Sequence, residues 1–241
     1  MYKKAMIKYK GVKTLEVLEG ANNYNKWIAD EMLRYMNGPI LEIGAGTGNI
    51  SVHFSGKKDL YLSESDSGLV KYLKNKFKNE KRVKVLKLDI LKVNQSFKEQ
   101  FASVIGVNVL EHIKDDNKAI NNINFLLKNR GRLLLLIPAK KMAYTNLDRQ
   151  LGHFRRYEKK ELKEKLEKNG FFVEKLFYFN TVGLVSWIIR DKFYRNSVSL
   201  SQWQIFIFDI LVPLLRKVES FVKPPIGISI IVVARKLNYN K

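Results

Sequence analysis

Three glycines at alternate positions, preceded by an acidic residue, give this chain its clearest chemical signal. Glu42 is followed by Gly44, Gly46 and Gly48. Glycine lets a backbone pass close to a ligand, because a Cβ would collide with it. A dinucleotide loop of the G-x-G-x-x-G type would need a third glycine-like residue where this chain has Asn49. The carboxylate would repel a pyrophosphate and attract a cationic amino-acid group, so the loop favours S-adenosylmethionine over NAD.

Polar residues also follow three further predicted strands. The strands at 60–63, 83–88 and 103–107 are followed by Glu64, Asp89 and Asn108. In an open α/β sheet the carboxyl ends of the strands form the ligand crevice, and a carboxylate about 20 residues past the loop binds ribose hydroxyls. Glu64 has this spacing, and Asp89 is placed to accept a hydrogen bond from an adenine amine. Each acid alone could instead cap a helix, but the series predicts a nucleoside site.

These motifs resemble those of the class I S-adenosylmethionine-dependent methyltransferases, and the resemblance covers nearly the whole chain. It implies ten donor-binding residues: Glu42, Gly44, Ala45, Gly46, Gly48, Glu64, Ser65, Asp89, Ile90 and Asn108. It also implies that residues 108–113 lie beside the reactive methyl group. The string at 151–157 is similar to that of a narrower bacterial and archaeal group, whose members often accompany glycosyltransferases that use polyprenyl phosphates.

Two of the three histidines are predicted to be catalytic. A base near the proton of a hydroxyl acceptor would assist methyl transfer, and histidine suits neutral pH. The resemblance places His112 near the methyl group and His153 in a loop that often contacts acceptors. His53, on the helix after the glycine loop, is predicted to be structural.

Five further residues are predicted to contact the acceptor: Tyr24, Asn25, Arg155, Arg156 and Tyr157. Two adjacent arginines suit a phosphate or carboxylate of the substrate. The structural alternative for these arginines is an ion pair within the loop, for instance with Asp148.

No metal site is predicted. Quinone-pathway methyltransferases carry a similar E-x-x-E-H pattern that can bind a divalent cation, but here Asn108 stands in place of the first carboxylate before Glu111 and His112. Asp115 and Asp116 are predicted to cap the following helix. The absence of cysteine excludes disulfides and thiolate metal sites.

These residues would be positioned by helices and strands whose order along the chain predicts one doubly wound, Rossmann-like α/β domain over 1–241. Its seven strands would be mostly parallel with an antiparallel edge strand. Apolar spacing predicts helices at 24–36, 67–77, 115–127 and 159–169, and strands at 131–137, 171–179 and 228–235. A chain of 241 residues that is 46% hydrophobic can bury the core of such a domain.

A helical insertion at 181–226 separates the last two predicted strands. Its second apolar run, 203–215, has polar residues on one narrow helical stripe: Gln202, Asp209, Arg216 and Ser220. A helix that is apolar nearly all round is buried or faces lipid, and this run is too short and interrupted to span a bilayer. It is predicted to be a lid over the acceptor or a shallow membrane-docking segment.

Charge does not identify a partner. The net charge of +21 comes from 33 Lys and 11 Arg, a surface that attracts anionic lipid or nucleic acid but is also typical of solvated, lysine-rich helices. Residues 1–13 are basic and lack the apolar core of a signal peptide. The chain is therefore expected in the cytoplasm, with peripheral contact to an anionic membrane as an additional expectation.

Two competing functions remain open beside methyl transfer to oxygen of a small-molecule or lipid-linked acceptor. RNA adenine methyltransferases carry Asn-(Leu/Pro)-Pro-(Tyr/Phe) after the fourth strand, where the aromatic ring stacks on a flipped base. This chain has neither proline nor aromatic residue at 108–111, so nucleic acid is the less favoured acceptor. The other alternative is a non-catalytic protein that binds S-adenosylmethionine and supports a glycosyltransferase system.

Overall fold

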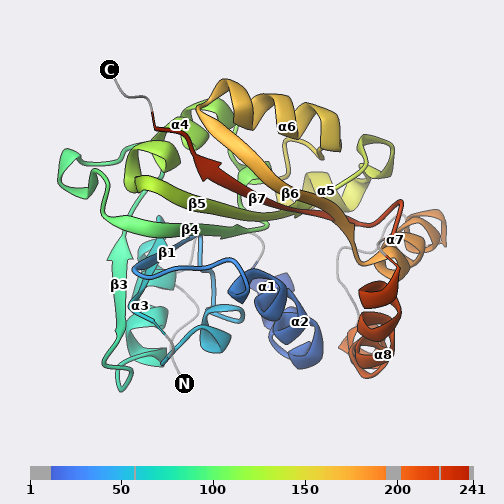
Figure 1. Ribbon diagram of the computed structural model, residues 1–241. Coiled ribbons are helices and arrows are strands. Elements are labelled where there is room, and N and C mark those ends of the chain that lie inside the picture. The colour runs from blue at the N-terminus through green and yellow to red at the C-terminus, as the bar shows by residue number, and fades with distance from the viewer. Residues whose placement is uncertain (1–11, 57, 194–201, 223, 239–241) are drawn as a thin grey trace.

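The computed structural model describes residues 12–56, 58–193, 202–222 and 224–238. Its centre is one seven-stranded sheet with the strand order β3-β2-β1-β4-β5-β7-β6 (Figure 1). The strands are β1 Ile40–Ile43, β2 Leu60–Glu64, β3 Val83–Lys87, β4 Phe101–Val107, β5 Leu127–Pro138, β6 Phe171–Phe179 and β7 Ser229–Lys236. The helices are α1 Val12–Glu19, α2 Asn22–Leu33, α3 Ser67–Lys76, α4 Asp116–Leu126, α5 Asn146–Leu151, α6 Lys159–Lys168, α7 Thr181–Phe193 and α8 Gln202–Phe221. The single-domain prediction over 1–241 and the expectation at 1–13 extend to residues that lie outside these ranges.

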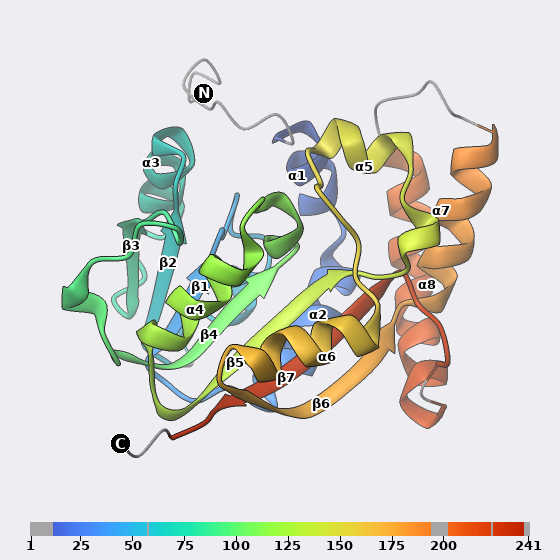
Figure 2. The same cartoon turned by 90° about the horizontal axis from the view of Figure 1, so that it is seen from above.

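The sheet has the predicted doubly wound α/β topology. Strands β1 to β5 pair in parallel, and β7 pairs antiparallel with both β5 and β6. The antiparallel strand therefore lies next to the edge, and β6 lies outside it. Helices α4 and α6 cover one face of the sheet, and α1, α2 and α3 lie on the other (Figures 1 and 2).

Two apolar cores hold these layers together. One lies between the sheet and α4 and α6, and the other between the sheet and α2, α3 and α8. Residues 133–137 of β5 are fully buried, which explains why their sequence is continuously apolar rather than alternating. The strand ends are thereby fixed rigidly at one edge of the sheet.

Helix boundaries differ from the prediction where tertiary contacts decide them. Helix α2 begins at Asn22, before the predicted residue 24. The side chain of Asp209, from α8, accepts hydrogen bonds from the backbone N–H groups of Asn23 and Tyr24 at 3.1 and 2.8 Å. These are N–H groups of the first turn, which have no partner within the helix, so a distant carboxylate caps it.

Capping of α4 is confirmed for one of the two predicted acids. Asp115 accepts a hydrogen bond from the backbone N–H of Lys118 at 2.9 Å. The prediction was wrong for Asp116, which is buried and accepts hydrogen bonds from the Tyr157 hydroxyl and the Lys165 ammonium at 2.8 and 2.7 Å. Asp116 therefore links α4 to Lys165 of α6 and to Tyr157 in the loop before α6.

The insertion forms α7 and α8; α8 packs against α2, and α7 lies beside α8 (Figure 2). Part of its predicted polar stripe faces the protein, because Asp209 caps α2 and Arg216 pairs with Asp30 at 2.7 Å. Most exposed side chains of α8 are apolar, and the exposed polar ones are Gln202, Gln204, Lys217 and Ser220. No helix in the described ranges is long and apolar enough to cross a membrane. Residues 194–201 and 223 of the predicted lid segment lie outside those ranges.

Candidate active site

The glycine loop follows β1 and is shaped by left-handed backbone conformations. Gly44 and Gly48 have φ angles of 61° and 74°. A Cβ on Gly44 would lie 2.7 Å from a methyl carbon of Val109, and one on Gly48 would lie 2.8 Å from the ring of Phe77. These glycines are therefore required by the packing of the protein against the loop, in addition to the ligand approach expected from the sequence.

Two buried carboxylates lie against this loop. Glu64, at the end of β2, accepts hydrogen bonds from the backbone N–H of Gly46 at 2.7 Å and of Ser65 at 3.1 Å, while burial raises its pKa. Glu42 accepts one from the Ser51 hydroxyl at 2.7 Å. Burial, with a smaller contribution from neighbouring Glu64, raises the pKa of Glu42 to about 7. A cationic group bound here would relieve the cost of burying these charges.

The other predicted donor residues line the same carboxyl edge of the sheet. Asp89 follows β3, is exposed and accepts a hydrogen bond from the Leu91 N–H at 2.9 Å. Ala45 and Ile90 are each 8% exposed. Ser65 and Asn108 are exposed, and Asn108 has a φ of 51°. Their roles as donor contacts stay predictions.

Helix α1 lies over the outer side of the loop, a contact that the sequence analysis missed. The side-chain amide of Asn49 donates to the Leu15 carbonyl at 3.0 Å, and a Cβ on Gly46 would lie 3.2 Å from the Leu15 side chain. Lys76 bridges Glu19 of α1 and the Thr47 carbonyl of the loop at 2.8 and 2.9 Å. Asn49, which distinguishes this loop from a dinucleotide loop, thus also holds α1 against it.

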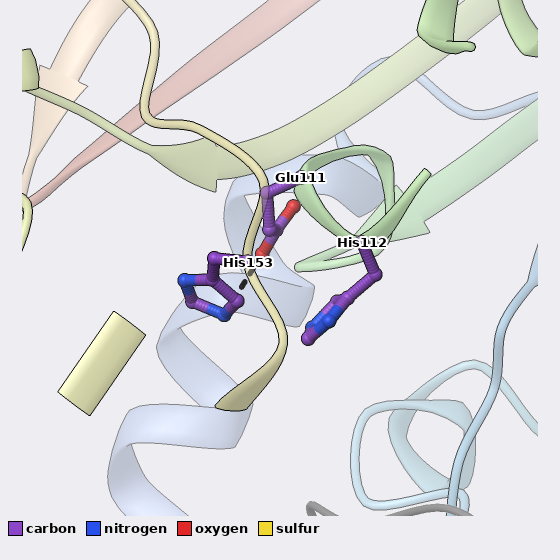
Figure 3. A group of neighbouring side chains, drawn as sticks. All are labelled: Glu111, His112 and His153. Atoms are coloured by element: carbon purple, nitrogen blue, oxygen red, sulfur yellow. Dashed lines mark ion pairs between the residues drawn. The ribbon is translucent and has the colours of Figure 1, made fainter. Parts of the chain in front are cut away.

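An acid and two histidines converge where β4 and α5 bring their following loops together (Figure 3). Glu111 and His112 belong to a short 3₁₀ turn, η4 Leu110–His112, and His153 follows α5. The backbone N–H of Phe154 donates to the Glu111 carbonyl at 2.8 Å, which holds the two loops together. Both predicted catalytic histidines therefore meet in one place, although 41 residues separate them in the sequence.

His153 is oriented by a carboxylate. Its Nδ1 lies 2.7 Å from Oδ1 of Asp148, and its Nε2 lies 4.0 Å from Oε1 of Glu111. The His112 and His153 rings meet edge to face with centroids 4.6 Å apart. Burial, reinforced by His153, lowers the pKa of His112 to about 4, so that ring is neutral at neutral pH.

Glu111 is the buried member of this group. Its side chain is fully buried, and neither carboxylate oxygen has a hydrogen-bond partner among the described residues. Burial is the largest of the effects that raise its pKa to about 8. Glu111 was not among the predicted site residues, although the adjacent Glu111-His112 pair after β4 was the signal that could have included it.

The predicted acceptor role of the loop 155–157 is corrected by the structure. Arg156 is 2% exposed, and its Nε donates to Asp148 Oδ1 at 2.9 Å. Arg155 pairs with Asp116 at 2.8 Å, and Tyr157 is fully buried with its hydroxyl on the same carboxylate. These three side chains hold the loop in place because their polar groups face buried acids, and the ion-pair alternative with Asp148 is the one present.

The two predicted acceptor residues of α2 differ in their surroundings. Asn25 is buried, and its side-chain amide donates to the Leu18 carbonyl at 2.9 Å, so the acceptor prediction is wrong for it. Tyr24 packs against the rings of Trp27, Phe179 and Phe208. It lies between α2, the end of β6 and α8, and its acceptor contact stays a prediction.

The glycine loop, the strand-end carboxylates and the adjacent acid–histidine group lie at the carboxyl ends of a mostly parallel sheet, which is where α/β proteins of this topology bind their ligands. Residues 21–176 match the family described as a methyltransferase domain. The chain therefore belongs to the methyltransferase-domain family. It is an enzyme of that class, and its methyl donor is S-adenosylmethionine.

Known proteins are similar in sequence to parts of the chain. Ribosomal RNA small subunit methyltransferase A of Pelagibacter ubique is 42% identical over 73 residues, 29% of this chain and 27% of that protein. The highly reducing polyketide synthase GPY1 of Gibberella fujikuroi is 34% identical over 111 residues, 41% of this chain and 4% of the synthase. The chain thus spans about a quarter or less of these relatives.

Solved structures resemble it over most of its length. An S-adenosylmethionine-dependent methyltransferase of Thermotoga maritima has 17% identity and a TM-score of 0.62, covering 95% of this chain and 97% of its own. A Haloferax volcanii protein solved in complex with the Trm112 methyltransferase activator has 13% identity and a TM-score of 0.64, covering 96% and 99%. At these identities the similarity shows a shared fold.

Proposed function

We propose that this methyltransferase transfers the methyl group to an oxygen of a small or lipid-linked acceptor at the cytoplasmic face of a membrane. The observation that carries the proposal is the group formed by Glu111, His112 and His153 at the end of β4. It adjoins the donor loop, since Val109, two residues before Glu111, packs against Gly44. A hydroxyl that reacts here would meet two histidine rings.

The donor side is formed by residues that would hold a cation. Glu42 and Glu64 flank the glycine loop, and a bound cation would favour the ionised form of both. When bound, S-adenosylmethionine supplies a methyl group on a positively charged sulfur. The rigid strand ends would position that end of the donor, and alignment accounts for much of the acceleration of a displacement reaction.

His153 has the arrangement of a general base. Its Nδ1–H donates to Asp148, which fixes the tautomer and leaves Nε2 as the acceptor. Nε2 would take the proton of the acceptor hydroxyl as the oxygen forms its bond to the methyl carbon. Asp148 is itself held by Arg156 and by the backbone N–H of Thr145, so the pair is oriented before an acceptor arrives.

The outward face of α8 supports a membrane-bound location. Its exposed apolar side chains are Trp203, Phe206, Ile207, Ile210, Leu211, Leu214, Val218 and Phe221. In the protein alone these side chains would be exposed to water. The polar Asp209 and Arg216 instead face the protein, where they contact Asn23 and Asp30 of α2. Aromatic and aliphatic residues on one face are typical of helices that lie in the membrane interface, and the net charge of +21 complements anionic lipid. The occupant of this face is therefore proposed to be an anionic bilayer.

Helix α7 joins this face to the chemical group. The indole of Trp187 donates to the Ala143 carbonyl at 3.2 Å, and the Arg156 guanidinium lies 4.7 Å from its ring centre. Arg156 in turn holds Asp148. Helix α7 is thus linked to His153 through Trp187, Arg156 and Asp148, and this link supports an acceptor that approaches beside α7.

The test is to incubate the purified protein with methyl-labelled S-adenosylmethionine and a lysate from its own source, and to separate lipid, nucleic acid, protein and small molecules. We expect label in the organic phase or in small molecules, and none with Glu64→Ala. Label in RNA would overturn the proposed acceptor class and agree with the 73-residue similarity to the ribosomal RNA methyltransferase. Donor binding without label in any fraction would indicate a support protein instead.

A further inference from the structure

The buried carboxyl group of Glu111 has no hydrogen-bond partner among the residues that the structure describes. Its side chain is fully buried. A buried polar group normally has a hydrogen-bond partner or binds a metal, because its desolvation is otherwise uncompensated. The group facing it is imidazole, with Nε2 of His153 4.0 Å from Oε1.

Three ligand atoms converge around this carboxylate. One atom from each of Glu111, His112 and His153 lies within 4.8 Å of the others (Figure 3). Ligands at about 2.1 Å from a tetrahedral ion are about 3.4 Å apart, so modest side-chain rotations would bring these atoms to bonding distance. Two come from η4 and one from the loop after α5, and that loop is held to η4 by the Phe154 N–H.

A carboxylate also orients one of the histidines in the way a metal ligand requires. The Nδ1 of His153 lies 2.7 Å from Asp148, which directs Nε2 toward Glu111. Histidine ligands commonly donate their second ring N–H to a carboxylate, and this contact raises their basicity. Asp148 was not among the predicted site residues, because its pairing with His153 depends on the turn that ends α5.

The geometry points to a binding site for a first-row divalent cation such as Zn²⁺, formed by Glu111, His112 and His153 and positioned by Asp148. Two imidazoles and one carboxylate suit Zn²⁺, Fe²⁺, Co²⁺ or Ni²⁺, whereas Mg²⁺ and Ca²⁺ prefer oxygen ligands. His153 takes the place of the carboxylate that is absent at Asn108, and it reaches the site from a loop 45 residues further along the chain.

Three protein ligands leave a position open for an acceptor oxygen. Catalytic zinc sites commonly have this composition, with water or substrate as the fourth ligand. An ion here would lower the pKa of a coordinated hydroxyl, and the released proton would pass to solvent. With the ion bound, Nε2 of His153 would be a ligand, so the role of base proposed above would apply to the protein without the ion. This last step rests on the proposed function, but binding of the cation does not.

The experiment is a titration of chelator-treated protein with Co²⁺ and with Zn²⁺, followed by visible absorption and by calorimetry, without donor or acceptor. We expect one saturable site per chain. Glu111→Gln, which preserves shape, and His153→Ala should weaken binding by more than the roughly 10- to 100-fold typical when an orienting carboxylate is lost. His53→Ala is the matched control and should bind like the wild type.

Imidazole signals give a readout independent of affinity. The chain has three histidines, so protein labelled with ¹⁵N in the histidine rings should show Zn²⁺-dependent shifts at His112 and His153 and none at His53. Absence of saturable binding by folded protein, unchanged binding by Glu111→Gln, or equal shifts at all three rings would overturn the inference. Cation binding with no methylated product would instead contradict the proposed function, and methylated product without cation binding would contradict this inference alone.

Discussion

At the scale of single residues, the site depends on acids whose charges are buried. Glu42 and Glu64 lie at the donor loop, and Glu111 and Asp148 at the histidines. Burial disfavours the charged form of each, and the partners that offset this cost differ. Asp148 has Arg156 and His153, which hold its pKa below the ordinary value despite burial, whereas Glu111 has no hydrogen-bonded partner among the described residues.

The first prediction concerns donor binding and pH. Burial raises the pKa of Glu42 to about 7 in the free protein, and a bound cation would lower it, so binding should release a proton below that pH. Affinity should therefore rise as the pH increases from about 6 toward about 7, and by at most about tenfold per unit, as measured by calorimetry. In Glu42→Gln this part of the pH dependence should disappear; an unchanged profile would contradict it.

The same residue predicts how stability varies with pH. Folded Glu42 keeps its proton above the ordinary carboxyl pKa of 4.5, where the unfolded chain has lost it. The free energy of unfolding should therefore fall as pH rises from about 4.5 to about 7. Urea unfolding of Glu42→Gln should show a smaller fall, and an equal fall in both proteins would assign the effect to other groups.

A third prediction concerns Glu64. Its carboxylate accepts a hydrogen bond from the Gly46 N–H and is predicted to bind ribose hydroxyls, so Glu64→Gln should weaken donor binding by roughly 1.5–3 kcal/mol, the range for hydrogen bonds to charged groups. Equilibrium dialysis with labelled donor measures this loss. Asp59→Asn, an exposed carboxylate change, is the control. Equal donor affinity in Glu64→Gln and wild type would contradict a role for Glu64 in donor binding.

At the scale of elements, the insertion is fastened by polar contacts rather than by an apolar seam alone. Asp209 of α8 caps α2, and Glu219 of α8 accepts hydrogen bonds from the backbone N–H groups of Asn180 and Thr181 at 3.1 and 2.8 Å. Asp209 thus caps the N-terminus of α2, and Glu219 binds the backbone at the start of α7. The exposed apolar side chains of α8 take no part in these contacts.

Asp209→Ala should therefore destabilise the protein by about 1–2 kcal/mol, because α2 loses its N-terminal cap and its favourable charge. Thermal and urea unfolding would measure the change. Asp59→Ala, which removes an exposed pair with Arg82, should cost less than about 1 kcal/mol. Equal losses in the two variants would show that the cap contributes nothing specific.

At the scale of the whole molecule, charge and the α8 face should act together on membranes. Replacement of Phe206, Leu214 and Phe221 by Ser removes side chains that are 55%, 62% and 79% exposed. The triple variant should keep its unfolding temperature and lose co-sedimentation with vesicles of phosphatidylglycerol and phosphatidylcholine. Such binding scales with buried apolar area and with attraction to anionic lipid.

Phe172→Ser, at the 50% exposed Phe172 of β6, is the matched control and should still bind vesicles. Wild-type protein should bind less to pure phosphatidylcholine, because the electrostatic part is then lost. Self-association of the wild type that disappears in the triple variant, without any vesicle binding, would assign the α8 face to a second copy of the chain.

Much of the fold could be predicted from local pattern. The segment 171–179 was predicted with the observed bounds, and the methyltransferase class predicted from the glycine loop is confirmed by the match to the methyltransferase-domain family. These features depend on periodicity and on glycine spacing, which a single segment carries by itself. The start of α2 was missed because its cap comes from Asp209, 187 residues further along the chain than Asn22.

The sequence by itself determined the sheet and the methyl donor, because strand ends and glycine turns are set locally and the sheet places them at one edge. Only the tertiary structure decided which polar groups meet. It paired Arg156 with Asp148 and turned Asp209 inward. It also brought His153 to Glu111, because loop contacts and burial are properties of segments far apart in the chain and depend on how those segments pack.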